Sequence, residues 1–130
     1  MRAKKSPLDV GRRERQIMEA VYRLGRATVG EVLAQLPDSP SYSAVRTMLG
    51  KLEAKGLLRH VQEGPRYLYL PVVPLHQVRE SALRRLVSSL FAGSSARAVS
   101  TLLDMGREEL TADDLEDLSR LIEQMRAEGR

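Results

Sequence analysis

Two prolines three residues apart, Pro71 and Pro74, place the strongest constraint on the fold of this 130-residue chain. Proline lacks an amide hydrogen and has a fixed φ, so the pair cannot lie within one helix or a central strand. We therefore expect the architecture to change near this pair. The sequence predicts one domain over residues 1–73 and a second over residues 74–130.

Helical patterns dominate the beginning of the first domain. A first helix is predicted over residues 9–24, and Gly25 ends it. Thr28 followed by Glu31 forms a capping-box pattern at the start of a second helix, which Pro37 ends. A short connection thus separates two consecutive helices.

A third helix is predicted between Ser41, a favourable N-cap, and Gly56. One face of this helix has apolar side chains at helical spacing: Val45, Met48, Leu49 and Leu52. The opposite face is short, polar and basic: Ser43, Arg46, Thr47, Gly50 and Lys51. The third helix is therefore expected to bury one face and expose a positive one.

Residues 58–62 and 66–70 alternate apolar and polar side chains around a turn at residues 63–65. This pattern predicts a β-hairpin. Three helices followed by a hairpin form a winged helix-turn-helix, in which the third helix enters the major groove of DNA and the hairpin forms the wing. The predicted fold class is mostly α, with this winged unit followed by a helical region.

Three amphipathic helices are predicted in the second domain: one ending at Gly93, one over residues 96–105 and one beginning at Thr111. Fewer than sixty residues make a poor independent core, so we expect a second copy of the chain to cover these helices. A different protein partner is the alternative. The candidate dimerisation residues are Leu86, Leu90, Leu102, Leu115, Leu118, Ile122 and Met125.

Charge is unevenly divided between the two halves. Residues 1–75 contain 13 Lys or Arg against 7 Asp or Glu, whereas residues 76–130 contain 8 against 10. A basic half favours a polyanionic partner, here a double-stranded DNA operator. The candidate DNA-binding residues are Ser41, Ser43, Ala44, Arg46, Thr47, Lys51, Lys55, Arg59 and Arg66.

The candidate DNA-binding residues have side chains suited to the DNA groups that they would contact. The short side chains of the third helix permit close approach to DNA, and the planar fork of Arg46 matches a guanine edge. Lys51 and Lys55 suit phosphates, and His60 lies with two arginines on the predicted wing. Two alternatives remain: a winged helix that binds a protein, and a regulator that responds to a small ligand.

No pattern indicates an enzyme, a metal site or a cofactor. The sequence has no cysteine, no Gly-x-Ser-x-Gly and no phosphate-binding glycine loop, and its two histidines, His60 and His76, are far apart. The acidic run over residues 113–117 is better explained as favouring the positive end of a helix dipole than as a cation site. Without a signal peptide or an apolar span, a cytoplasmic protein with no membrane insertion is expected.

Residues 43–58, SAVRTMLGKLEAKGLL, followed by EGPRYLY at residues 63–69, resemble the penicillinase repressor family. The family pattern has a Thr-Val-Arg-Thr-like recognition helix, and Ala44 replaces its first Thr. Residues 90–93 and 110–118 resemble the family's dimerisation region. The resemblance implies a homodimeric repressor that binds a palindromic operator.

Two family properties depend on residues that differ here. Copper-responsive members have a Cys-x-Cys motif, which a chain without cysteine cannot provide. The β-lactam-responsive members are cleaved by a membrane-bound sensor protease between Asn and Phe. The matching pair in this chain is Thr101-Leu102, the expected cleavage site if such a protease is a partner.

Overall fold

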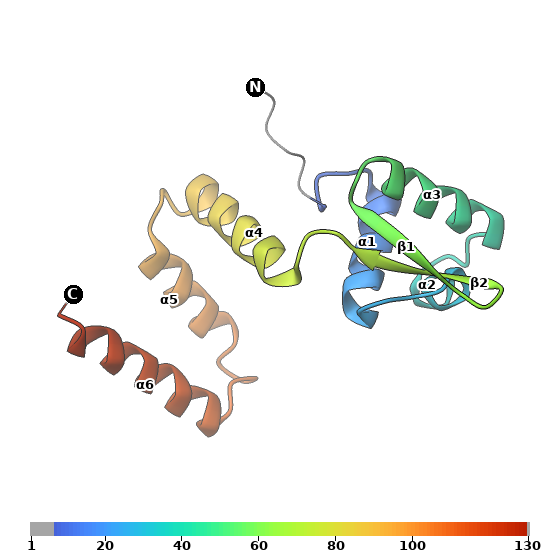
Figure 1. Cartoon of the computed structure of the whole chain (residues 1–130). Helices are drawn as coiled ribbons and strands as arrows, with labels where there is room; N and C mark the ends of the chain where they lie inside the picture. Colours follow the sequence, from blue (N-terminus) through green and yellow to red (C-terminus); the bar gives the residue numbers. More distant parts are fainter. Residues whose placement is uncertain (1–6, 130) are drawn as a thin grey trace. The chain divides into compact units, whose positions relative to one another are not determined.

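The computed structural model describes residues 7–129, so residues 1–6 and 130 of the predicted domains lie outside the described residues. Its order of elements confirms the predicted fold class, mostly α with a two-stranded hairpin (Figure 1). The elements are α1 (Arg12–Leu24), α2 (Val29–Gln35), α3 (Tyr42–Ala54), β1 (Leu58–Glu63), β2 (Arg66–Pro71), α4 (Leu75–Leu90), α5 (Ser95–Met105) and α6 (Ala112–Ala127).

Local capping fixes the ends of the first three helices. The hydroxyl of Thr28 accepts the Glu31 N–H at 3.2 Å, and the Glu31 carboxylate accepts the Thr28 N–H at 2.9 Å, which confirms the predicted capping box of α2. Gly25, with φ of 85°, follows α1. At the other end, α1 begins at Arg12, later than predicted, because Gly11 is extended and has no side chain to cap the helix.

The turn between α2 and α3 contains two consecutive non-glycine residues with positive φ, Asp38 at 63° and Ser39 at 41°. Aspartate tolerates this left-handed region better than most residues, because its short side chain can bond locally. This turn leads directly to Ser41, whose Oγ accepts the Ala44 N–H at 3.1 Å and caps α3. The start of α3 is thus defined by a tight turn and a cap.

The core of the winged unit lies between α1, α2, α3 and the hairpin. Its largest fully buried side chains are Ile17, Met18, Val21, Val32, Val45, Leu49, Leu52 and Leu58. Burying such side chains contributes about 1.5–3 kcal/mol each relative to exposure. Since three of them lie on α3, the predicted apolar face of that helix is confirmed, and its opposite face is directed away from the core.

The hairpin pairs β1 with β2 antiparallel, from Leu58 opposite Pro71 to Glu63 opposite Arg66. A third segment joins it, since Ala27 and Tyr69 exchange two backbone hydrogen bonds of 2.8 and 3.0 Å. Ala27 lies between α1 and α2. The wing is therefore tied by its backbone to the three-helix core.

Two compact units divide the chain, Met1–Leu83 and Arg84–Arg130, so that the boundary falls within α4. The change of architecture predicted at residues 73 and 74 lies just before α4 begins at Leu75. Val78 on its second turn is buried, and the Tyr22 hydroxyl donates to the Val73 carbonyl at 2.7 Å. The beginning of α4 therefore packs with the winged unit.

The second unit has almost no buried surface of its own. Among described residues 84–129, Ala98 is the only buried residue, and α6 has none. The apolar faces of this unit are exposed in the single chain.

Within residues 7–129 no single helix has the length and composition needed to cross a membrane. Helices α4 and α5 meet those two requirements only when taken together, and the pair is bent by 101°.

The capping box of α2 provides a stability test. Thr28→Ala removes the hydroxyl that accepts the Glu31 N–H, and we expect it to lower the free energy of unfolding by about 1 kcal/mol. Thr28→Ser keeps the acceptor and should retain most of the stability. Urea denaturation measures both, and equal stability of Thr28→Ala and the wild type would show that the cap contributes nothing.

Candidate nucleic-acid interface

The exposed face of α3 carries the predicted recognition residues. Because Val45, Leu49 and Leu52 are buried, the intervening positions face outward, and the exposed side chains are Ser43, Arg46, Thr47 and Lys51. Ala44 is half-buried, and its backbone N–H is bonded to the N-cap serine. Four candidate residues thus share one solvent-facing helix surface.

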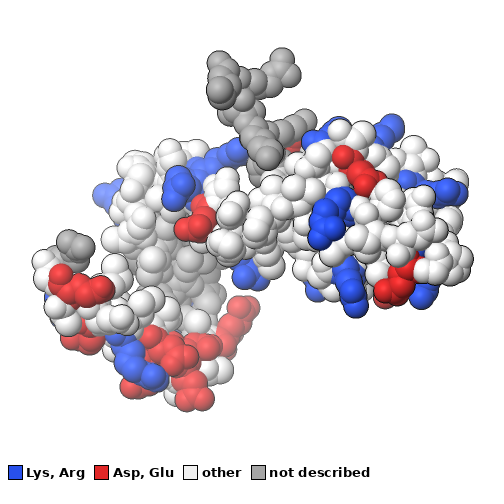
Figure 2. All heavy atoms as spheres, viewed as in Figure 1, with Lys and Arg blue, Asp and Glu red and all other residues white. Residues whose placement is uncertain are grey.

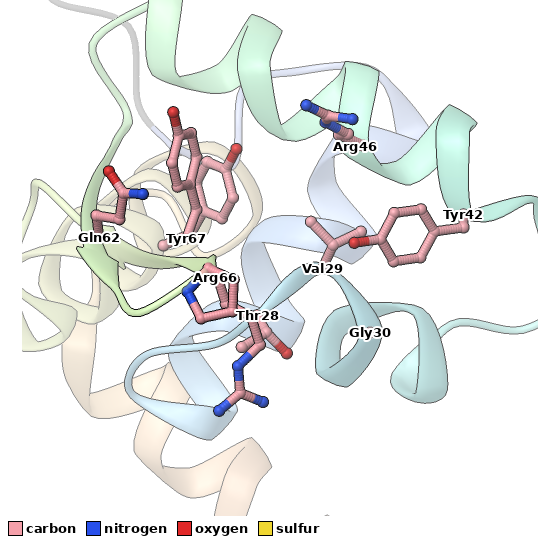
Figure 3. Close-up of a pocket in the computed structure, with 10 residues that line it drawn as sticks. Thr28, Val29, Gly30, Tyr42, Arg46, Gln62, Arg66 and Tyr67 are labelled. Carbon is pink, nitrogen blue, oxygen red and sulfur yellow. The ribbon is translucent and has the colours of Figure 1, made fainter.

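An open groove of about 590 Å³ lies between α3, the start of α2 and the hairpin (Figure 3). Arg46 from α3 and Arg66 from β2 both line it, so the fold brings two predicted DNA-binding residues to one concave surface. None of the described residues that line this groove is acidic. Its lining consists of Thr28, Val29, Gly30, Tyr42, Arg46, Gln62, Pro65, Arg66, Tyr67 and Tyr69.

An aromatic cluster holds the wing beside α3. The His60 ring stacks on Tyr67 with centroids 4.1 Å apart and an interplanar angle of 12°, and Tyr69 packs 5.9 Å from the same imidazole. His60 Nδ1 lies 2.7 Å from the Glu53 carboxylate, which also accepts the His60 backbone N–H at 3.1 Å. Glu53 belongs to α3. Helix α3 therefore holds the wing by one carboxylate.

Other predicted DNA-binding residues have different surroundings. Lys55 Nζ lies 2.8 Å from the Glu14 carboxylate of α1, an ion pair between two helices. Arg59 is exposed, but the strand register places it on the hairpin face opposite His60 and Tyr67. The structure does not bring Lys55 or Arg59 to the groove between α3 and the wing.

Hydrogen bonds and burial shift the pKa of two groups at this surface. Two hydrogen bonds with Thr28, the larger effect from its backbone N–H and the smaller from its side chain, lower the pKa of Glu31. The capping carboxylate therefore stays charged. Burial raises the pKa of Tyr69, an effect that the nearby Glu53 reinforces and Arg46 opposes. The Tyr69 phenol therefore stays protonated and neutral beside the groove.

The two units differ in their balance of charge. Figure 2 shows Lys and Arg spread over the winged unit, whereas the acidic side chains gather around α6 and the segment before it. In this acidic segment, the Asp114 carboxylate accepts the Thr111 N–H at 3.0 Å and caps α6. Within residues 7–129, no three His, Asp or Glu side chains are placed to hold a metal ion.

The candidate dimerisation residues are all exposed in the single chain. They lie on α4, α5 and α6, and their exposed fractions range from 37% for Leu118 to 73% for Leu90. The proposed cleavage pair, Thr101-Leu102, lies inside α5, where Thr101 Oγ1 donates to the Arg97 carbonyl at 3.0 Å. This peptide bond is part of an intact helix.

Sequence reasoning missed the aromatic and amide side chains of the groove: Tyr42, Gln62 and Tyr67. The alternation of the two strands contained a usable signal, because residues 60, 62, 67 and 69 share one hairpin face once the turn is set at Gly64. Selecting residues by positive charge favoured Arg59, which the same alternation places on the other face. Alternation also places Arg66 on that face, but Arg66 directly follows the turn and lines the groove. Tyr42 had no such signal.

The sequence model of the penicillinase repressor family matches residues 10–124. The chain belongs to the penicillinase repressor family. The penicillinase repressor of Bacillus licheniformis is 23% identical over 113 residues, which cover 85% of this chain and 87% of that protein. The family resemblance drawn from the recognition helix and wing is thus confirmed over most of the chain.

Two solved structures are similar to this fold. The DNA-binding domain of the repressor BlaI is 28% identical, with a TM-score of 0.48, and the match covers 56% of this chain and 90% of that one. A mutant MarR from E. coli is 20% identical, with a TM-score of 0.51 over 92% of this chain and 80% of that one. The second likeness shows the fold alone.

The contact between α3 and the wing is open to a double-mutant cycle. With side chains about one third exposed, His60 and Glu53 are expected to couple by about 0.2–1 kcal/mol when Glu53→Ala and His60→Ala are combined. Urea unfolding measures the coupling. The matched control is the Asp117–Arg120 pair within α6, which is 72% and 70% exposed and is expected to couple more weakly because solvent screens it more. Equal coupling in both pairs would contradict a structural role for Glu53.

Proposed function

We propose that this protein is a DNA-binding transcriptional repressor that acts in the cytoplasm and binds a palindromic operator as a homodimer. The observation that carries the proposal is the basic, solvent-facing surface of α3 beside a wing that supplies Arg66. Membership of the penicillinase repressor family supports the repressor function. That family is a class of regulators rather than of enzymes.

The exposed face of α3 suits base reading in the major groove. Arg46 presents two parallel donors to the O6 and N7 of a guanine, while Ser43 and Thr47 are short enough to let the helix approach the bases. Lys51, one turn after Thr47, suits a phosphate as a point charge. We assign sequence recognition to Arg46 and positioning to Lys51, with Ser41 and Ala44 defining the helix start.

The exposed apolar faces of the second unit support self-association. A unit with a single buried residue among those described cannot be stabilised by its own core, whereas a two-fold copy would bury leucines on α4, α5 and α6. Two-fold symmetry in the protein then matches two half-sites in the DNA. We propose residues 74–130 as the dimerisation region and residues 1–73 as the DNA-binding domain.

Release of the repressor by a membrane-bound sensor protease is a further part of the proposal. Proteases bind extended chains, whereas the Thr101-Leu102 bond lies in the middle of α5. Cleavage there requires α5 to unwind first. Proteolysis would then act on the opened second unit rather than on its folded form.

Selection from a pool of random duplexes at near-physiological salt tests the function directly. The proposal expects enrichment of a palindrome, and sedimentation of the complex should show two chains per duplex. Absence of enrichment would contradict it and favour a winged helix that binds protein. Enrichment only in the presence of an added small molecule would indicate the ligand-responsive alternative.

Three substitutions separate base reading from charge. Arg46→Ala should cost about 1–3 kcal/mol of binding and relax base preference at one position of each half-site. Lys51→Ala should weaken binding to all sequences alike and reduce the salt slope by about 1 per chain. Lys55→Ala should change the slope less, because Glu14 already pairs with this lysine.

Titration of the selected operator at several salt concentrations measures all three effects. Lys55→Ala is the matched control for Lys51→Ala, since both remove a lysine from the end of the same helix. Operator binding that is unaffected by Arg46→Ala and Lys51→Ala would show that another surface contacts the DNA.

The apolar face of α6 provides the test of the dimer. Leu118→Asp would bury an unpaired carboxylate in the proposed interface, so we expect monomers in sedimentation equilibrium. Gln124→Asp adds the same charge to an exposed position of α6 outside the apolar stripe, and it should remain dimeric. A dimeric Leu118→Asp variant would refute the assigned interface.

A further inference from the structure

We propose that the groove between α3 and the wing holds the sugar-phosphate backbone of one operator strand, with the hydroxyls of Tyr42 and Tyr67 donating to phosphate oxygens. The inference rests on the proposed function and deepens it. It assigns DNA contacts to two uncharged residues, Tyr42 and Tyr67. A search for positively charged side chains misses both.

The tyrosines are unevenly distributed. The chain has four, and three of them line this groove. Tyr42 and Tyr67 are 55% and 43% exposed, so neither ring is needed to fill the core. A phenol offers a neutral hydrogen-bond donor at the end of a rigid ring, and tyrosine is one of the side chains that bond phosphate oxygens in protein–DNA complexes.

The rest of the groove matches the repeating chemistry of a phosphodiester strand. Arg66 enters from β2 and Gln62 adds an amide donor from β1, whereas Arg46, assigned above to a base edge, borders the groove on α3. Val29 and Pro65 supply apolar surface suited to the deoxyribose between phosphates. No described lining residue is acidic, so no carboxylate of the lining itself repels the backbone.

The wing tyrosine is held in place before DNA binds. Its ring stacks on His60, and Glu53 of α3 holds that imidazole at 2.7 Å. The Tyr67 hydroxyl is therefore held in a defined position relative to α3. Fixing a side chain in advance reduces the entropy lost on binding, so this stack strengthens the proposed phosphate contact.

The geometry of the duplex also favours a backbone in this place. When α3 lies in the major groove and the hairpin reaches the neighbouring minor groove, the strand that separates the two grooves passes between helix and hairpin. The groove of Figure 3 occupies that interval, between Arg46 of α3 and Tyr67 of the wing.

The test combines Tyr→Phe variants with operator duplexes in which one phosphate at a time is a neutral methylphosphonate. Tyr42→Phe and Tyr67→Phe should each bind the unmodified operator about tenfold more weakly per half-site. The methylphosphonate at the contacted phosphate should weaken the wild type but cause little further loss in the matching variant. Such non-additivity assigns one hydroxyl to one phosphate.

The dependence on salt separates this contact from an ion pair. Tyr67→Phe should leave the salt slope unchanged because the hydroxyl is neutral, whereas Arg66→Ala should reduce it by about 1 per chain. Tyr22→Phe is the matched control: its hydroxyl donates to the Val73 carbonyl outside the groove, so its effect should add to that of every methylphosphonate. Equal melting temperatures of Tyr42→Phe, Tyr67→Phe and the wild type exclude loss of folding as the cause.

Two negative results have different meanings. If the wild type selects an operator and the groove variants bind it as tightly as the wild type, or show additive effects at every phosphate, the inference is overturned and the proposed function stands. If the wild type selects no duplex, the proposed function fails and the inference fails with it.

Discussion

Burial of one face of α3 is the constraint on which the remaining structure depends. Val45, Leu49 and Leu52 are almost fully removed from solvent, and the helix can do this in only one rotational setting. That setting decides which side chains face outward and directs Glu53 toward the first strand of the wing. The candidate interface is therefore a consequence of core packing.

The wing is attached to the three-helix unit at two separate places, one of them on α3. Backbone bonds between Ala27 and Tyr69 fix one end of the hairpin to the connection between α1 and α2, and the Glu53–His60 contact fixes the first strand to α3. A two-stranded hairpin alone is only marginally stable in water. Its attachment to α3 and to the connection between α1 and α2 explains how six-residue strands can present a defined surface beside the groove.

Local patterns predicted the fold well because its helix ends are determined locally. The capping box at Thr28 and the glycine after α1 are short-range signals, and the structure shows both. The candidate site was predicted only in part. Lys55 and Glu14 are 41 residues apart in sequence, so no periodicity could have indicated that this lysine is paired. The proposed contacts of the second unit with another copy of the chain likewise join residues that a single sequence does not pair.

The near absence of a core in the second unit affects how the proposed repressor would persist in a cell. A dimer whose helices are covered only by their copies has a stability that rises with its own concentration. Chains made in small numbers would spend more time open and exposed to general proteolysis, whereas abundant chains would protect one another. The amount of repressor would then respond steeply to its rate of synthesis, with a threshold below which little survives.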